Sequence, residues 1–220
     1  MVFRRMSAPQ MQDLSQGEIA YAKLVAAIRS GVFRPGDRLR ETDIAARFSL
    51  SRTPIREALR KLEADGIIEH RARIGAVIRS LSHAEVVELY EMRVVLERTA
   101  AEMAAKHAVA AEVDALEAIN RDLANAVATP EKAAAINQDF HRGIYQATRN
   151  RFLLEAARAL NNALMLLGET TLADAERIET VCHQHQDILD AIRAGDVEAA
   201  GASAEAHLQT SLRHRLKARP

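Results

Sequence analysis

The stretch "GVFRPGDRLRETDIAARFSLSRTPIREALRKLEADGII", residues 31–68, decides the fold of the first part of the chain. It opens with the turn pair Pro35-Gly36, and a short helical pattern follows at roughly residues 41–48. "SLSRTP" breaks that helix, and Ser51 or Thr53 can cap the next one, which runs to about Asp65. The sequence therefore predicts two short helices separated by a tight turn.

The flanks of this stretch complete a recognisable order of elements. An apolar pattern over 18–30 predicts an earlier helix, which Gly31 ends. After residue 65, "GIIEH" and "GAVIRS" are β-prone runs on either side of the turn-like "RARIG" at 71–75, which predicts a two-stranded hairpin. Helix, helix, tight turn, helix and hairpin is the order of a winged helix-turn-helix.

The predicted helix at 52–65 has one apolar and one basic face. Its apolar positions follow the spacing of a buried stripe: Ile55, Ala58, Leu59 and Leu62. Arg52, Arg56 and Arg60 recur every four residues on an adjoining face, with Thr53 beside them. In a helix-turn-helix the start of the second helix contacts base edges, where arginine and hydroxyl side chains bind guanine or phosphate. The alternative is a solvated basic face without a ligand.

Charge is divided unevenly along the chain. Residues 1–80 carry 15 Lys+Arg against 9 Asp+Glu, a net of +6, whereas residues 81–220 carry 15 against 21, a net of −6. A basic first part joined to an acidic remainder indicates a polyanion-binding module fused to a second domain.

From residue 83 onward the pattern is helical nearly throughout. Breaks near 108–111, 129–130, 149–150, 168–173 and 195–196 leave about six helices with short connections. We therefore expect a mainly α protein, with an N-terminal winged helix-turn-helix over 1–80 and a C-terminal all-α antiparallel helical bundle over 81–220.

Composition restricts where the protein works. No apolar run approaches the ~18–20 residues that span a membrane, and the N-terminal "MVFRRMSAPQMQ" lacks the hydrophobic segment of a secretory signal. The single cysteine, Cys182, excludes an internal disulfide framework. We expect a cytoplasmic protein with no membrane partner.

Residues 31–68 resemble the DNA-binding domain of GntR-type transcription regulators. The shared motifs are the PG turn, an L-x-E-x-x-[IL]-A helix, S-R-T-P-[IV]-R-E-A-L and L-x-x-[DE]-G. The resemblance implies contacts to double-stranded operator DNA from four residues of the helix start and from the glycine of the wing: Ser51, Arg52, Thr53, Arg56 and Gly75. Thr42 is a departure, because relatives often have arginine there.

The second part resembles the all-helical FCD ligand-binding domain of the FadR-like subgroup. The matching segments are "LYEMRVVLE" (89–97), "NQDFHRGIY" (137–145), "HQDILDAIRAGDVEAA" (185–200) and "HL" (207–208). The resemblance implies a ligand-responsive regulator that binds a pseudo-palindromic operator as a homodimer and senses a small organic acid. Effector binding would shift the population of DNA-binding states.

Three histidines are expected to point into the bundle: His141, His185 and His207. Asn137 shares the face of His141, whereas Asp139 is about 200° away around the helix. Hydrogen-bonded core histidines are one reading. The other is a metal site, because helical bundles build such sites from imidazoles on facing helices.

The FCD resemblance implies a divalent metal, such as zinc, nickel or manganese, on Asn137, His141, His185 and His207. The first position is commonly Asp in metal-binding members, and an amide oxygen is the weaker ligand. Four neutral ligands would leave the 2+ charge uncompensated and suited to a carboxylate effector.

Arg93 lies in the middle of an apolar face of its predicted helix, so its guanidinium must be paired. An ion pair with Glu97, four residues later, would satisfy it. The FCD resemblance implies instead that Arg93 holds a carboxylate of the effector.

Two other classes of function are weighed against a regulator. The three histidines would also suit a helical metal-dependent hydrolase, although the sequence has no HExxH, Ser/His/Asp set or glycine-rich phosphate loop. A scaffold that uses the winged helix for protein contacts is disfavoured by the arginines at the helix start.

Overall fold

The computed structural model describes residues 14–217. The N-terminal segment expected not to be a signal, and the predicted domain ends at residues 1 and 220, lie outside these residues. Contacts divide the chain into two compact units, one of residues 1–80 with 162–168 and the other of 81–161 with 169–220.

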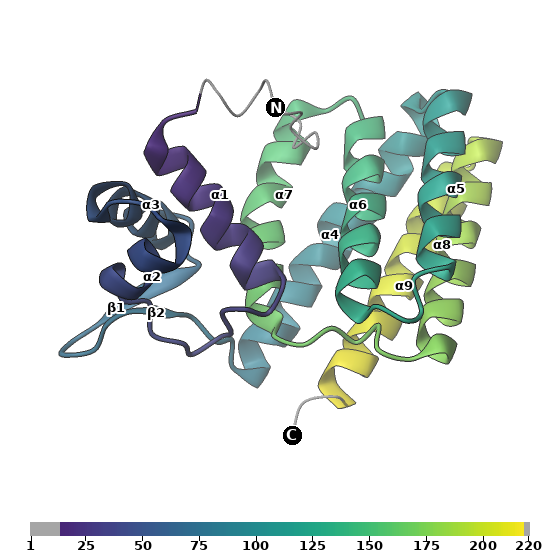
Figure 1. Cartoon of the computed structure of the whole chain (residues 1–220). Coiled ribbons are helices and arrows are strands. Elements are labelled where there is room, and N and C mark those ends of the chain that lie inside the picture. Colours follow the sequence, from purple (N-terminus) through teal and green to yellow (C-terminus); the bar gives the residue numbers. More distant parts are fainter. Residues whose placement is uncertain (1–13, 218–220) are drawn as a thin grey trace. The chain divides into compact units, whose positions relative to one another are not determined.

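The first unit begins with α1 (Gln16–Arg29), α2 (Glu41–Phe48) and α3 (Arg52–Ala64) (Figure 1). Helix α1 starts with a capping box between Ser15 and Glu18 and packs against α3. The hairpin of β1 (Ile68–Arg71) and β2 (Gly75–Ile78) is antiparallel, with Ile68 opposite Ile78. The predicted winged helix-turn-helix is confirmed.

The second unit is helical: α4 (His83–His107), α5 (Ala110–Ala124), α6 (Pro130–Ala147), α7 (Arg151–Ala163), α8 (Ala175–Ala194) and α9 (Val197–Lys217). A short 3-10 turn, η2 (Leu164–Leu167), follows α7. By their contacts, residues 162–168 group with the first unit. Every predicted helix break matches a connection in the structure. The mainly α fold class is confirmed.

Two apolar clusters hold the second unit together. The larger one joins α4, α5, α6, α7, α8 and α9 around residues such as Phe140, Leu189 and Ala200, which are fully buried. The smaller one surrounds Leu123 and Ile178. Between Ala194 and Val197 the chain reverses at Gly195, whose φ of +68° favours glycine, so that α8 and α9 pack as antiparallel neighbours.

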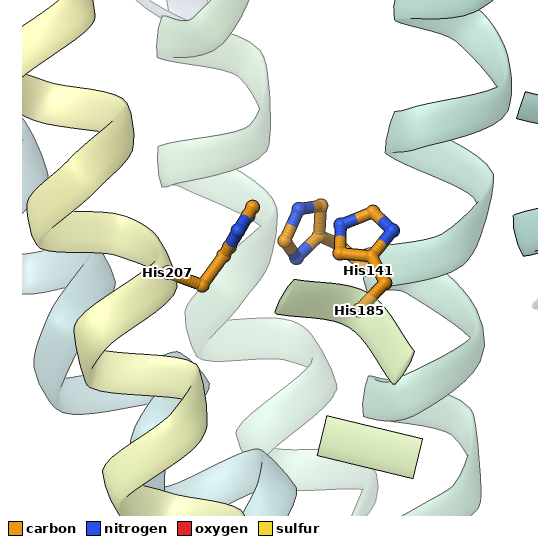
Figure 2. Close-up of side chains that lie close together, drawn as sticks. All are labelled: His141, His185 and His207. Atoms are coloured by element: carbon orange, nitrogen blue, oxygen red, sulfur yellow. The ribbon is translucent and has the colours of Figure 1, made fainter. Parts of the chain in front are cut away.

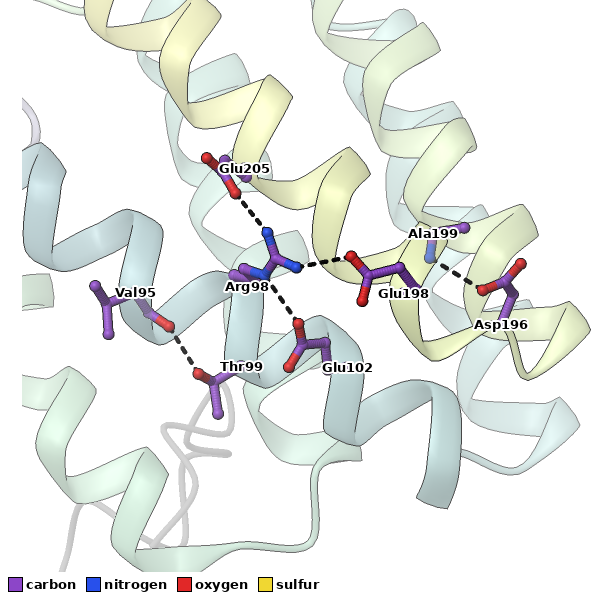
Figure 3. A network of polar contacts seen from close by, with 8 residues as sticks. All are labelled: Val95, Arg98, Thr99, Glu102, Asp196, Glu198, Ala199 and Glu205. Carbon is purple, nitrogen blue, oxygen red and sulfur yellow. Dashed lines mark hydrogen bonds and ion pairs between the residues drawn. The ribbon is translucent and has the colours of Figure 1, made fainter.

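An ion-pair network ties α4 to α9 on their outer side (Figure 3). The guanidinium of Arg98 contacts Glu102 at 2.9 Å, Glu198 at 3.0 Å and Glu205 at 2.7 Å. Gly201 lets the two helices approach, because a Cβ there would lie 2.5 Å from a carboxylate oxygen of Glu102. The network therefore links α4 to α9 close to two buried polar residues: Arg98 directly follows Glu97, and Glu205 is two residues before His207.

Within residues 14–217 no helix is both long enough and apolar enough to cross a membrane.

Candidate functional site

The basic face of α3 is exposed, as the residue pattern predicts. Ile55, Ala58 and Leu62 are buried on one side of the helix, whereas Ser51, Arg52, Thr53, Arg56 and Arg60 are exposed. Ser51 is the N-cap residue, but its side chain makes no capping hydrogen bond and is free for an outside partner. The wing glycine, Gly75, has a φ of +96° and lies at the start of β2.

Glu41, at the start of α2, holds two of these arginines. Its carboxylate accepts one hydrogen bond from Arg52 and two from Arg56, all at 3.0 Å. These hydrogen bonds, first those of Arg56 and then those of Arg52, lower the pKa of Glu41 to about 2. The carboxylate is therefore ionised throughout the working pH range, and it pre-orients two guanidinium groups at the exposed helix start.

The three predicted histidines meet in the interior of the second unit (Figure 2). His141 comes from α6, His185 from α8 and His207 from α9, and all three are buried. One ligand atom from each ring lies within 4.8 Å of the others. The ring of His185 also stacks on Phe140 with centroids 3.7 Å apart, which fixes its plane.

The Nδ1 atom of each imidazole has a protein partner. Nδ1 of His141 lies 2.6 Å from Oε2 of Glu97, and Nδ1 of His207 lies 3.0 Å from Oε1 of Gln184. Nδ1 of His185 lies 3.2 Å from Oδ1 of Asn120. Because the Asn120 amide donates to the carbonyl of Cys182, its Oδ1 accepts, and Nδ1 of His185 must be the donor.

This arrangement leaves at least two of the Nε2 atoms available. Within residues 14–217, Nε2 of His141 and of His185 is buried without a hydrogen-bond partner, and so is Oδ1 of Asn137, one turn before His141. A cavity of about 10 Å³, lined in part by Glu97, His141 and His207, has room for about one water-sized body. Neutral Nε2 donors whose Nδ1–H groups are fixed by neighbours are the form in which imidazoles bind metal ions. The residues present fit a divalent metal.

Burial and neighbouring charges keep two of the three imidazoles, those of His185 and His207, neutral. Burial, followed by the other histidines, lowers the pKa of His185 and of His207 well below the ordinary value. Burial alone would raise the pKa of Glu97, but Arg93 and His141 outweigh burial and lower it. The interior thus combines the ionised carboxylate of Glu97 with the neutral imidazoles of His185 and His207.

Arg93 is buried and paired with Glu97. Its Nε donates to Oε1 of that carboxylate at 2.9 Å, which is the local pairing weighed against an effector role. Its guanidinium also lies over the ring of Tyr90, 4.7 Å from the centroid. Glu97 therefore connects Arg93 to His141.

Sequence motifs identify both units. Residues 16–78 match the model of bacterial regulatory proteins of the gntR family, and residues 88–210 match the model of the FCD domain. The chain belongs to the GntR family and carries an FCD domain. This GntR-family chain is a DNA-binding transcription regulator and not an enzyme, so the hydrolase alternative does not hold.

Its relatives cover both units. It is 32% identical over 197 residues to YdhC, an uncharacterized HTH-type transcriptional regulator of Bacillus subtilis, with 88% of each chain covered. It is also 32% identical to a probable D-xylose utilization operon repressor of Paenarthrobacter nicotinovorans, over 95% of this chain and 88% of that protein.

Solved structures share the fold. A GntR regulator from Rhodococcus sp. RHA1 superposes with a TM-score of 0.79 at 26% identity, over 94% of this chain and 100% of that one. E. coli McbR/YncC gives a TM-score of 0.81 at 19% identity, over 93% and 98%.

Several residues of these sites escaped sequence reasoning, namely Glu41, Asn120, Gln184 and the role of Glu97 toward His141. Asn120 had a signal, because it continues the buried spacing of Val113, Leu116 and Leu123 on α5 as the one polar member. Glu41 stands in the L-x-E-x-x-[IL]-A motif, but the motif does not tell which side chains it contacts, and Gln184 had no signal in the sequence.

Proposed function

We propose that this chain represses or activates an operon of sugar or organic acid metabolism, in the cytoplasm, in response to a small organic acid. The D-xylose repressor and the regulators of the uxu and gluconate operons among its relatives support this class of operon. DNA contact is assigned to Ser51, Arg52, Thr53, Arg56 and Gly75.

The helical domain is proposed to hold a divalent metal through Asn137, His141, His185 and His207. The observation that carries this proposal is the convergence of three buried imidazoles, each with a partner at Nδ1. Beside them, Nε2 of His141 and of His185 and Oδ1 of Asn137 are buried and have no hydrogen-bond partner within residues 14–217. Buried polar atoms without partners are costly, so a ligand that takes their lone pairs explains why they persist. The metal, when bound, would supply a Lewis-acidic point for an effector carboxylate.

Arg93 is proposed to contribute to the same effector site. Its Nε donates to Glu97, and the two Nη groups of the guanidinium would bind the carboxylate of the effector. Effector binding would then change the relative populations of domain arrangements and so the operator affinity.

A homodimer is proposed from two helices of the second unit that expose apolar side chains. Helix α7 buries only Ala157 within the single chain, and Phe152 at its start is 76% exposed. On α4, Met92 and Val95 are 49% and 55% exposed. A second copy would cover such faces, and a two-fold dimer suits a pseudo-palindromic operator.

Calorimetric titration of metal-stripped protein tests the metal. We expect zinc, nickel or manganese to bind at one site per chain, and His141→Ala to abolish binding. His183→Ala is the matched control, because His183 lies on α8 beside the site but is exposed. Absence of binding by all three ions would overturn the metal proposal.

Operator titration tests DNA recognition. We expect steep salt dependence and a sequence-specific excess over random DNA, and Arg52→Ala should lose about 1–3 kcal/mol of that specificity. An unchanged preference among operators would contradict the role of Arg52.

A further inference from the structure

A second buried arginine, Arg177, lies in the first turn of α8. Arg177 is 4% exposed, and its Nη2 donates to Oγ of Ser211 on α9 at 2.9 Å. Nε and Nη1 of the same guanidinium are buried and make no hydrogen bond within the described part of the chain. Asp174 is used elsewhere, since its carboxylate caps the helix by accepting from the backbone N–H of Arg177 at 2.7 Å.

Arg177 differs from Arg93 in its charge balance. Arg93 has a carboxylate partner at 2.9 Å, whereas no Asp or Glu between residues 14 and 217 lies within ion-pair distance of Arg177. Burial lowers the pKa of Arg177, with only partial opposition from Tyr90 and Asp174. A guanidinium nevertheless stays protonated in proteins, so the fold carries a buried positive charge without a counter-ion.

This charge lies close to the histidine cluster. Arg177 precedes His185 by two turns of α8, and Ser211 follows His207 by one turn of α9. The positive charge of Arg177 contributes to the lowered pKa of both His185 and His207. The two unpaired N–H groups of Arg177 and the unpaired Nε2 of His185 thus come from the same helix, α8, whereas the other unpaired Nε2 comes from His141 on α6.

We infer that Arg177, positioned by Ser211, binds a second acid group of the effector, so that the effector is a dicarboxylate rather than a monocarboxylate. The inference rests on the proposed function in that the other carboxylate is placed at the histidine cluster. A divalent metal ion on four neutral ligands carries two positive charges, and Arg177 adds a third. The charges of Arg93 and Glu97 cancel. A dianion compensates that excess better than a monoanion does, and guanidinium offers paired donors to a carboxylate.

The effector-free protein gives the first test, with Arg177→Met as the variant. If Arg177 serves to bind a ligand and does not stabilise the fold, Arg177→Met replaces an unpaired buried charge by an apolar side chain of similar length. The melting temperature should then stay unchanged or rise. A fall of several degrees would show that Arg177 supports the fold itself, which would overturn the inference. Arg193→Met is the matched control, because Arg193 is exposed on the same helix and pairs with Asp114 and Glu117.

The second test compares acids at equal ionic strength and pH. Zinc-loaded protein is titrated with succinate, malate and tricarballylate, and separately with butyrate and lactate, with melting temperature and calorimetry as readouts. We expect at least one acid with two or more carboxylates to bind more tightly than either monocarboxylate. Arg177→Met should weaken that binding at least tenfold, whereas Arg193→Met should not. Equal binding of both acid classes, no binding of any acid, or an unchanged affinity in Arg177→Met would each overturn the inference.

Repeating the titrations with protein that has been stripped of metal and dialysed free of chelator separates this inference from the metal proposal. If zinc fails to bind but dicarboxylates still need Arg177, the metal proposal fails and the role of Arg177 stands. If zinc binds and dicarboxylates ignore Arg177, the metal proposal stands and the inference fails.

Discussion

Oε2 of Glu97 lies 2.6 Å from Nδ1 of His141, and the same carboxylate holds Arg93 through its other oxygen. One side chain of α4 therefore sets the ring orientation of a histidine on α6 and neutralises a buried arginine. Breaking this relationship disturbs the site without removing any proposed metal ligand.

We expect Glu97→Gln to weaken metal binding by about 10–100-fold, the range typical of lost partners of metal-binding histidines. Gln keeps the size of the side chain but removes the charge that orients His141 and compensates Arg93. Calorimetry with zinc measures the change. Glu91→Gln, an exposed position on the same helix, serves as the control and should bind zinc like the parent.

Asn137→Asp should tighten metal binding by on the order of tenfold or more. An added negative charge attracts a divalent ion, and the cost of desolvating the carboxylate offsets most of that attraction. Competition with a zinc-sensitive dye measures the affinity. An affinity equal to that of the parent would show that residue 137 does not reach the ion. Asp139→Asn, on the exposed face of α6 beside Arg142, should leave the affinity unchanged.

Glu41→Gln should lower the discrimination between operator and random DNA. Without the carboxylate, Arg52 and Arg56 lose the partner that pre-orients them. The repulsion between the negative charge of Glu41 and the DNA phosphates disappears as well. Binding to random DNA should therefore strengthen a few-fold and specific binding should not, which titrations at several salt concentrations can separate. Asp43→Asn is the control, because Asp43 lies on the same helix as Glu41 but accepts a hydrogen bond from Thr42. A specificity ratio equal to the parent's would contradict pre-orientation.

Metal-free protein should lose stability as the pH falls from about 8 to 5. His185 and His207 have lowered pKa values in the folded state, so the unfolded chain binds protons that the folded chain does not. The loss begins near the unfolded imidazole pKa of about 6.5 and grows toward the folded pKa. Urea denaturation at several pH values measures it. The double variant His185→Gln and His207→Gln should show a flatter curve, and an equal slope would refute the assignment.

Phe152→Asp should shift the protein from dimer to monomer if α7 lies in the subunit interface. A charge placed on an apolar contact costs several kcal/mol once it is buried, but little while it stays exposed. Sedimentation velocity measures the state. Glu155→Gln on the same helix is the control. A Phe152→Asp protein that stays dimeric would move the interface elsewhere.

Local periodicity was enough to predict much of the molecule. The stripe of α3, the hairpin and the helix breaks depend on neighbours in sequence, and the structure has them where the pattern put them. The inward direction of His141, His185 and His207 follows from the same periodicity.

Contacts between helices were beyond such reasoning. Whether Asn120 meets His185 depends on how α5 and α8 align, and that alignment results from the packing of the whole core. Arg93 illustrates a different limit, since its spacing allowed both an ion pair with Glu97 and a ligand role. Arg177 continues the buried spacing of Val181 and His185, so its burial could have been predicted, but the absence of an acid partner could not.

Helix α7 has a consequence for behaviour in dilute solution. A helix of 13 residues is marginal in water unless other surfaces cover its apolar side. On α7, Ala157 is buried and Leu153 and Leu154 are partly buried against the core, but Phe152 stays exposed. If a second copy supplies that cover, the order of α7 depends on protein concentration. Melting temperature should then rise with concentration. In a cell with few copies of the regulator, the number of copies would therefore set the fraction of chains in which α7 is folded, before any effector binds.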